Sequence, residues 1–511
     1  MSAPRDDASP NKTAADGAAS AAGSSIDSAA SAAGSSNDDA RELRRRDFLR
    51  LAGAGTGALI AGGLLPAEAA AGVPSSDPIV ARMKPRRSGP TASVVVIGAG
   101  AWGVWTAHHL RQQGVQVTLV DMYGPANSRA TSGDETRGIR SSYGDRTTGE
   151  QWTGWARQGL VRWRDFDAEF GKRFGTRFFV TTGDVIFRNE EEPFTTRTRE
   201  IWQKLGVPHE VLTNDEARKR WPMIDPRESK VILYEPDAGV ARARHSVQAL
   251  AAVVRDAGVK YVVGRAHTGA TRSGRMEGVT LDDGTVLTAD AYVFACGPWL
   301  RKVFPDLLGN RMRTPLGHVC YFGTPEGDDR FTHPNIPSWN VPGVTGWGAL
   351  PVDSRGFRVR GAFAPPPPKD VDEDDDGPPP PPPPPPDPRQ QDPDVSVRWS
   401  NQDRIDGSRR VLASCFPALA EAPLLETRSC HYESSVNRNF IIDRVPGNEN
   451  AWVVGVGQAE GFKFAPVVGE YAAWRVLGDG GDPALAAAFR MPTEEYEPTP
   501  TATRASREDE E

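Results

Sequence analysis

A glycine-rich turn between a strand and a helix most constrains the fold of this chain. Residues 93–97 (S-V-V-V-I) are typical of a buried parallel strand, and G-A-G-A-W-G follows at residues 98–103. A helical stretch at 104–113 and a second strand at 115–120 then lead to Asp121. Because the whole βαβ unit is present and not a lone glycine motif, the sequence predicts a Rossmann-type domain that binds a dinucleotide.

Each glycine of the turn has its own physical role. Gly98 permits the tight turn, Gly100 lets the backbone approach a pyrophosphate, and Gly103 lets helix and strand pack closely. The pyrophosphate is expected at the positive end of the helix dipole. Asp121 stands where an acid can hold ribose hydroxyls, which disfavours NADP. The alternative is a glycine-rich turn that binds nothing.

The N-terminal part has the composition of a targeting segment. Residues 1–40 are rich in Ala, Ser, Gly and Asp and are expected to be disordered. R-R-R-D-F-L at 44–49, a weakly apolar run at 51–65 and small residues at 67–71 follow. This order predicts a twin-arginine signal at 41–71, recognised by the Tat translocon and cleaved near residue 70, so that the protein is exported to the periplasm or secreted. An uncleaved anchor or an accidental basic helix start are the alternatives.

Charge and cysteine content exclude several classes of protein. The formal net charge of -7 gives no reason to expect nucleic acid as a partner. The apolar run near the N-terminus is too short and glycine-rich for a stable membrane span. The four cysteines are too few and too scattered for a disulfide scaffold, and no cluster of His and Cys suggests a metal site.

Three separated segments carry a second, more specific pattern. Residues 133–144 read G-D-E-T-R-G-I-R-S-S-Y-G, C-H-Y at 430–432 precedes F-I-I-D at 440–443, and G-F-K-F follows at 461–464. In motif order and spacing this resembles the monomeric sarcosine oxidase and N-methyltryptophan oxidase family of D-amino-acid-oxidase-like flavoproteins. The resemblance covers about residues 92–490 and implies FAD as the cofactor. It also implies oxidation of the C–N bond of a small amine or amino acid.

The expected fold is α/β with α+β character. A Rossmann-type FAD-binding domain is joined to a discontinuous substrate domain with a mainly antiparallel sheet. The expected boundaries are 92–150, 235–309 and 426–490 for the FAD domain, 151–234 and 310–425 for the substrate domain, 364–395 for a proline-rich and acidic insertion, and 491–511 for a disordered tail. The insertion is expected to extend as polyproline II and to lie in solvent, with a proline-binding partner as an alternative.

The resemblance assigns roles to four side chains. The family cysteine of C-x-Y forms a thioether to the flavin, and Cys430 matches it. Arg140 and Lys463 match the residues that grip the substrate carboxylate, and Arg137 is expected beside the flavin. Only ten of the 60 basic residues are lysines, and this rarity supports a specific role for Lys463 independently of the resemblance. A structural cysteine or an export disulfide at Cys430, and salt bridges at the arginines, are the alternatives.

Two departures from the family pattern concern the substrate and oxygen side. The family carries G-x-K-x-G-x-H with a lysine that activates O₂, whereas Arg358 stands near that lysine position here and the histidine is absent. The family's G-H before G-F-K-F is replaced by Ala459 and Glu460. Glu460 is expected either to contact a cationic part of a substrate or to face solvent. The substrate is therefore not expected to be sarcosine itself.

Together these patterns predict a set of site residues and a reaction. The predicted catalytic residues are Arg140, Lys463 and Arg358, and the predicted cofactor-binding residues are Gly98, Gly100, Gly103, Asp121, Arg137, Val263, Gly297, Cys430 and Phe462. The expected reaction yields an imine and passes electrons to O₂, giving H₂O₂. A dehydrogenase that uses another acceptor, and a non-catalytic nucleotide-binding protein, remain alternatives.

Overall fold

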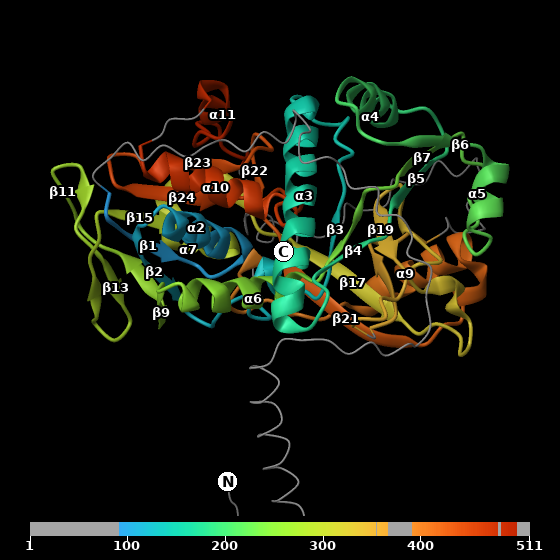
Figure 1. Cartoon of the computed structure of the whole chain (residues 1–511), viewed down its shortest axis with the longest axis horizontal. Helices are drawn as coiled ribbons and strands as arrows, with labels where there is room; N and C mark the ends of the chain where they lie inside the picture. Colours follow the sequence, from blue (N-terminus) through green and yellow to red (C-terminus); the bar gives the residue numbers. More distant parts are fainter. Residues whose placement is uncertain (1–90, 354, 366–390, 479–481, 498–511) are drawn as a thin grey trace, which may run out of the picture. The chain divides into compact units, whose positions relative to one another are not determined.

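A six-stranded sheet is built around the predicted glycine turn (Figure 1). Its order is β23 (Ile441–Arg444), β24 (Ala451–Gly455), β15 (Ala291–Phe294), β1 (Ser93–Ile97), β2 (Gln116–Asp121) and β9 (Lys260–Val263). The pairings from β24 to β9 are parallel, and β23 runs antiparallel to β24. This computed structural model describes residues 91–353, 355–365, 391–478 and 482–497, all within one compact unit.

The predicted βαβ unit is confirmed. Strand β1 is almost wholly buried, as its run of β-branched residues requires. Helix α2 (Ala101–Gln112) begins directly after Gly100, three residues earlier than predicted, and ends before Gly114, whose φ of +79° favours glycine. The early start of α2 places its N-terminus against the turn.

Helices cover one face of this sheet. α10 (Ala465–Val476) and α6 (Ala243–Asp256) both pack on α2. The approach of α10 is close because Gly469 has no side chain, since a Cβ there would lie 2.6 Å from the Trp105 backbone. The other face carries small elements: β10 (Ala266–Thr268), β11 (Thr271–Arg272), β12 (Arg275–Met276), β13 (Val279–Leu281), β14 (Val286–Leu287), α7 (Leu300–Val303) and α8 (Pro305–Leu308).

A second, eight-stranded sheet confirms the mainly antiparallel architecture predicted for the substrate side. Its order is β21 (Leu424–His431), β17 (Leu316–Phe322), β20 (Phe357–Arg360), β19 (Val344–Trp347), β18 (Ser338–Val341), β5 (Asp184–Arg188), β7 (Val231–Glu235) and β6 (Glu210–Leu212). Only the β18–β5 pairing is parallel among these strands. Three helices accompany the sheet: α4 (Pro193–Lys204), α5 (Asn214–Arg220) and α9 (Gln402–Cys415).

The long helix α3 (Gly149–Phe174) stands between the two sheets in Figure 1. It contacts α10 of the parallel sheet's helical layer as well as α4, β3 (Arg137–Ile139) and β4 (Phe179–Thr181). The buried aromatic side chains of α3 belong to the same core as the parallel sheet. Their prediction as core residues is confirmed: Trp152, Trp155, Trp163, Phe166 and Phe170.

Short elements complete the described chain. They are η2 (Thr131–Gly133), η3 (Gly297–Trp299), η4 (Asp329–Phe331), η6 (Pro417–Leu419), β8 (Gly239–Ala241), β16 (Met312–Arg313), β22 (Ser434–Ser435) and α11 (Pro483–Ala488). Strand β8 joins β3 and β4 in a small sheet that carries Arg137.

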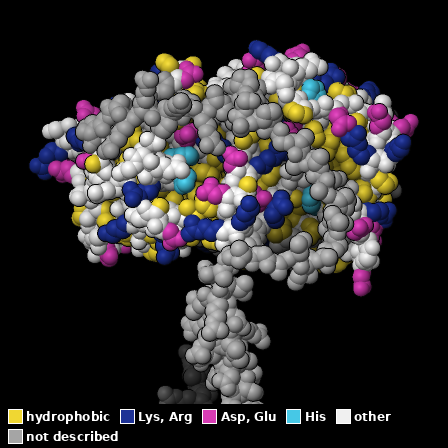
Figure 2. All heavy atoms as spheres, in the orientation of Figure 1, with side chains coloured by type: hydrophobic (Ala, Val, Ile, Leu, Met, Phe, Trp, Pro, Cys, Tyr) yellow, Lys and Arg dark blue, Asp and Glu magenta, His cyan; other side chains and the backbone are white. Residues whose placement is uncertain are grey.

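Several predictions fall on residues outside the described ranges. These are the disordered start at 1–40, the signal at 41–71, and most of the insertion at 364–395 and of the tail at 491–511. The predicted domain boundaries stay predictions. Among the described residues, no helix combines the length and apolar character needed to cross a bilayer. Basic and acidic side chains are interspersed over the face shown in Figure 2.

Candidate active site

The glycine turn leaves no room for side chains at two of its three glycines. Gly98 has a φ of +105°, and a Cβ there would lie 2.3 Å from the Ala295 oxygen. A Cβ at Gly103 would lie 1.8 Å from the Gly98 oxygen, so this residue packs behind the turn. Gly100 caps α2 without a side-chain hydrogen bond. Within the described residues, the backbone N–H groups of Trp102 and Gly103 have no acceptor, which suits an anionic ligand.

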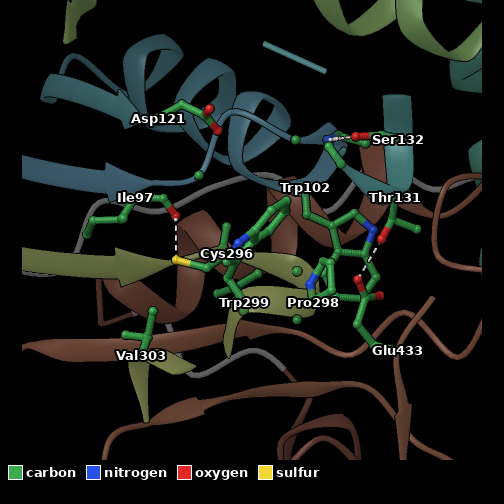
Figure 3. Close-up of a pocket in the computed structure, with 18 of the residues that line it drawn as sticks. Ile97, Trp102, Asp121, Thr131, Ser132, Cys296, Pro298, Trp299, Val303 and Glu433 are labelled. Atoms are coloured by element: carbon green, nitrogen blue, oxygen red, sulfur yellow. Dashed lines mark hydrogen bonds between the residues drawn. The ribbon is translucent and has the colours of Figure 1, made fainter. Parts of the chain in front are cut away.

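A cavity of about 490 Å³ opens beside this turn (Figure 3). Six of the nine predicted cofactor residues line it: Gly98, Gly100, Asp121, Arg137, Gly297 and Phe462. Gly103 lies behind Gly98, and the Val263 side chain is 64% exposed, so that its neighbour Gly264 lines the cavity in its place. Cys430 is not a lining residue, but its Sγ lies 3.4 Å from Arg137 Nη2.

Asp121 is fixed by the backbone at one end of the cavity. Its carboxylate accepts hydrogen bonds from Ala99 N at 2.8 Å and from the N–H groups of Tyr123 and Gly124. Burial raises the pKa of Asp121, and these three hydrogen bonds oppose that rise. A carboxylate oxygen has two lone pairs, so the residue can still accept a hydrogen bond from a ribose hydroxyl.

The sequence did not reveal a buried acid on the far wall of the cavity. Glu433 accepts a hydrogen bond from Thr131 Oγ1 at 2.8 Å, drawn in Figure 3, and one from Gly457 N at 3.3 Å. Burial raises the pKa of Glu433. Trp102 lies on another wall and donates its Nε1 hydrogen to the Gly461 oxygen at 2.8 Å. Only closeness to the motifs could have marked these residues, because their partners are remote in sequence.

Two arginine side chains gather around Asp134, and one of them, Arg137, also contacts Cys430. Arg137 forms an ion pair with Asp134 and donates to the Thr131 oxygen at 2.7 Å. Arg358 is 1% exposed, and its guanidinium lies 4.0 Å from the centre of the Trp347 ring and 3.5 Å from Asp134. Although burial alone would raise the pKa of Asp134, these guanidiniums hold it well below its usual range. Arg358 therefore belongs with Arg137, apart from the other predicted catalytic residues.

Arg140 and Lys463 meet in a second buried cluster. Lys463 is 5% exposed, and its Nζ donates to Tyr143 Oη at 2.7 Å. Burial lowers the pKa of Lys463 to about 8, an effect that Glu460 opposes and Arg140 reinforces. Glu460 was expected to contact a cationic substrate group or to face solvent. It instead pairs with Arg146 of this chain at 3.3 Å, and its side chain is one-third exposed.

The Arg140 guanidinium of this cluster is partly buried. Within the described residues it makes no hydrogen bond and no direct ion pair, although it interacts electrostatically with Asp184, Tyr143 and Glu460. These groups raise the pKa of Arg140 against the effect of burial. A guanidinium whose donors are not taken up by protein acceptors can bind a carboxylate through a pair of parallel hydrogen bonds.

These features define a dinucleotide-dependent oxidoreductase with a buried cationic site beside its cofactor cavity. The chain belongs to the FAD dependent oxidoreductase family, whose profile matches residues 93–475. The residues present fit FAD, because the glycine turn, the free N–H groups of α2 and the long cavity supply what its diphosphate and nucleoside need.

Relatives of known activity cover most of the chain. The monomeric sarcosine oxidase of Streptomyces avermitilis is 25% identical over 389 residues, which are 75% of this chain and 93% of the relative. The N-methyl-L-tryptophan oxidase of Yersinia pestis is 23% identical, covering 74% and 93%. The crystal structure of L-proline dehydrogenase from P. horikoshii superposes with a TM-score of 0.61 at 18% identity, covering 79% and 97%.

Proposed function

We propose that this protein oxidises the C–N bond of a small secondary or primary amino acid to an imine. The observation that carries the proposal is the closeness of two cations in one cluster, the partly buried Arg140 and the buried Lys463. Two cations in a water-poor site bind a carboxylate strongly and fix its orientation. The relatives named sarcosine oxidase and N-methyl-L-tryptophan oxidase act on N-methylated amino acids, which fits this class of substrate.

The work of the protein is binding and orientation. Arg140 offers a planar fork for the carboxylate, and Lys463, held by Tyr143, adds a point charge. With the carboxylate fixed, the carbon that bears the amine faces the cofactor cavity in a site from which water is largely excluded. Bound there, FAD would supply a two-electron acceptor for the oxidation of that carbon. The amine must be neutral to react, so it gives its proton to solvent water before oxidation, and water later hydrolyses the imine.

We propose Cys430 as the point of covalent attachment for the cofactor. Its Sγ lies 3.4 Å from the guanidinium of Arg137, and Arg137 itself lines the cofactor cavity, so the sulfur lies close to the proposed cofactor site. All four cysteines of the described chain are free of disulfides, and Cys430 is partly accessible, unlike the buried Cys320 and Cys415.

O₂ is the proposed electron acceptor, with H₂O₂ as product. Arg358 stands near the sequence position where the resembling family carries its oxygen-activating lysine. It pairs with Asp134, which also pairs with the cavity-lining Arg137, and its Nε and Nη1 have no partner among the described residues. A positive charge beside the cofactor stabilises reduced oxygen species. A dehydrogenase with another acceptor is the second candidate, because Arg358 departs from the lysine. Peroxide release under air separates the two.

Anaerobic reduction of the bound flavin tests the proposed function. The loaded protein is mixed with N-methyl amino acids, cyclic imino acids and primary amino acids in turn. At least one class should bleach the flavin absorbance without air, whereas the same compounds lacking the carboxylate should not. If no amine of any class bleaches it, the protein is a nucleotide-binding protein without this activity.

We also propose that the protein is exported by the twin-arginine pathway. Support comes from the order of a basic segment at 44–50, an apolar run at 51–65 and small residues at 67–71. This pathway moves folded proteins, so FAD can be bound before transport. The Tat translocon is accordingly a proposed partner.

A further inference from the structure

Residues 391–398, which begin within the proline-rich insertion predicted at 364–395, contact residues that line the cofactor cavity. We call residues 391–398 the strap. Its first residue, Gln391, accepts a hydrogen bond from Thr314 Oγ1 at 2.6 Å, and Ser396 Oγ lies 2.7 Å from His431 Nε2. These contacts fix the strap beside β17 and β21, next to Cys430.

Asp394 joins the strap to three residues that line the cavity. Its carboxylate accepts hydrogen bonds from Trp299 Nε1 at 2.8 Å and Lys302 Nζ at 2.5 Å, and Arg265 lies at 3.5 Å. All three donors line the cavity, and they come from two separate segments of the chain. Lys302 also pairs with Asp392 at 3.0 Å. One carboxylate therefore links the segment that follows β9 to the segment that follows β15.

The other half of the strap reaches the flavin side. The Pro393 oxygen accepts hydrogen bonds from Arg398 Nη2 at 2.7 Å and from Arg129 Nη1 at 3.0 Å. Arg129 precedes η2, which supplies Thr131 to the cavity wall. The Arg398 oxygen accepts from Ser429 N at 2.9 Å, one residue before Cys430. The strap thus spans from the nucleotide end of the cavity to Cys430.

We propose that the strap closes over the bound FAD and that Asp394 is the residue that holds it shut. Each of its ion pairs is partly exposed and contributes little alone, but the carboxylate joins three donors in one network. FAD can enter or leave only when these contacts break together. The inference rests on FAD binding and not on the amine substrate, so it stands or falls separately from the proposed reaction.

The rate of FAD release tests this proposal. The protein carries Cys430→Ala, so that a covalent bond cannot mask release, and flavin fluorescence reports the free cofactor. Asp394→Asn should accelerate release about tenfold or more, because a neutral amide loses the charge-assisted contacts. Asp328→Asn is the matched control: Asp328 is 19% exposed and pairs with Arg330, whereas Asp394 is 17% exposed and pairs with Lys302. Equal release rates in the two variants would overturn the proposal.

The salt dependence of FAD release and the affinity for ADP distinguish loss of the Asp394 contacts from a general loss of structure. Raising KCl from about 0.05 M to about 0.5 M should accelerate release while Asp394 is present and much less in Asp394→Asn. If release responded to salt equally in Asp394→Asn and in the protein that keeps Asp394, the proposed role of Asp394 would be contradicted.

ADP, which needs only the nucleotide end of the cavity, is the second probe, for use if Cys430→Ala loads no FAD. Its dissociation constant should rise in Asp394→Asn and stay constant in Asp328→Asn. A constant value in both variants would again overturn the proposal.

Discussion

Lys463 couples the proposed substrate site to pH. Its pKa lies at about 8, so the side chain is a cation below that pH and neutral above it. Carboxylate binding should therefore be strongest below pH 8 and should weaken as the pH rises through 8, by up to about tenfold per unit. Acetate is a suitable probe because its own carboxyl stays ionised throughout. Its inhibition constant should follow this curve in the wild type and be flat in Lys463→Met; a flat wild-type profile would remove the lysine from carboxylate binding.

Arg140 should contribute to the same affinity without a pH dependence. Arg140→Gln should raise KM for a carboxylate substrate by about 10- to 100-fold, the equivalent of one charge-assisted hydrogen-bonded pair. Steady-state kinetics with the amino acid and with its decarboxylated amine provide the comparison, since the amine should respond little. Arg199→Gln on α4, which pairs with Glu191 at the surface, is the control variant. An unchanged KM in Arg140→Gln would place the carboxylate elsewhere.

If the flavin is attached covalently at Cys430, its yellow colour should stay with the denatured protein. Acid precipitation should leave the flavin with the wild-type protein, because a thioether survives denaturation. In Cys430→Ala the yellow colour should move to the supernatant, while Cys296→Ala behaves as the wild type. A colourless wild-type precipitate would mean that FAD is held without a covalent bond.

At the scale of single residues, the sequence predicted the residues of local motifs but not those whose roles depend on contacts remote in sequence. The glycine turn and Asp121 were found because their geometry depends on about 20 neighbouring residues. Glu433 was missed because its role depends on Thr131 and Gly457, which approach it only in the fold. The pairing of Arg358 with Asp134 could not be predicted either, since the strand register of β20 sets it.

At the scale of elements, helix α3 positions the lysine. Gly159 allows the helix to lie directly against the chain at Lys463, since a Cβ at 159 would lie 2.3 Å from the Lys463 oxygen. Trp163, one turn later, donates its Nε1 hydrogen to the same oxygen at 3.2 Å. Periodicity revealed the apolar face of α3 but not this contact, because the partner lies some 300 residues away.

Two glycines of α3 form a matched pair for testing this contact. Gly159→Ala should destabilise the protein by about 1–3 kcal/mol through overpacking and should raise KM by displacing Lys463. Gly154→Ala meets no atom within 4 Å and should stabilise it by up to about 1 kcal/mol, because alanine favours helix. Thermal or urea unfolding measures both. If the two variants had equal stability, the close approach would have no energetic role.

At the scale of the whole molecule, the proposed export adds a prediction about processing. The mature protein should begin near residue 70, which N-terminal sequencing of exported material would show. Replacing Arg45 and Arg46 by lysine should block export and leave a flavin-loaded precursor inside the cell, because the translocon reads the arginine pair. Arg44→Lys is the control. Export that persists in the double variant would exclude this pathway.

The parallel sheet also has a consequence for biosynthesis. β1 at residues 93–97 lies next to β15, and β24 at 451–455 lies beyond β15, so the sheet draws on both ends of the described chain. At roughly 5–20 residues per second, a ribosome needs tens of seconds to make the stretch between these strands. β1 can pair with β2 and β15 early in this time, whereas β15 keeps one edge unpaired until β24 is made.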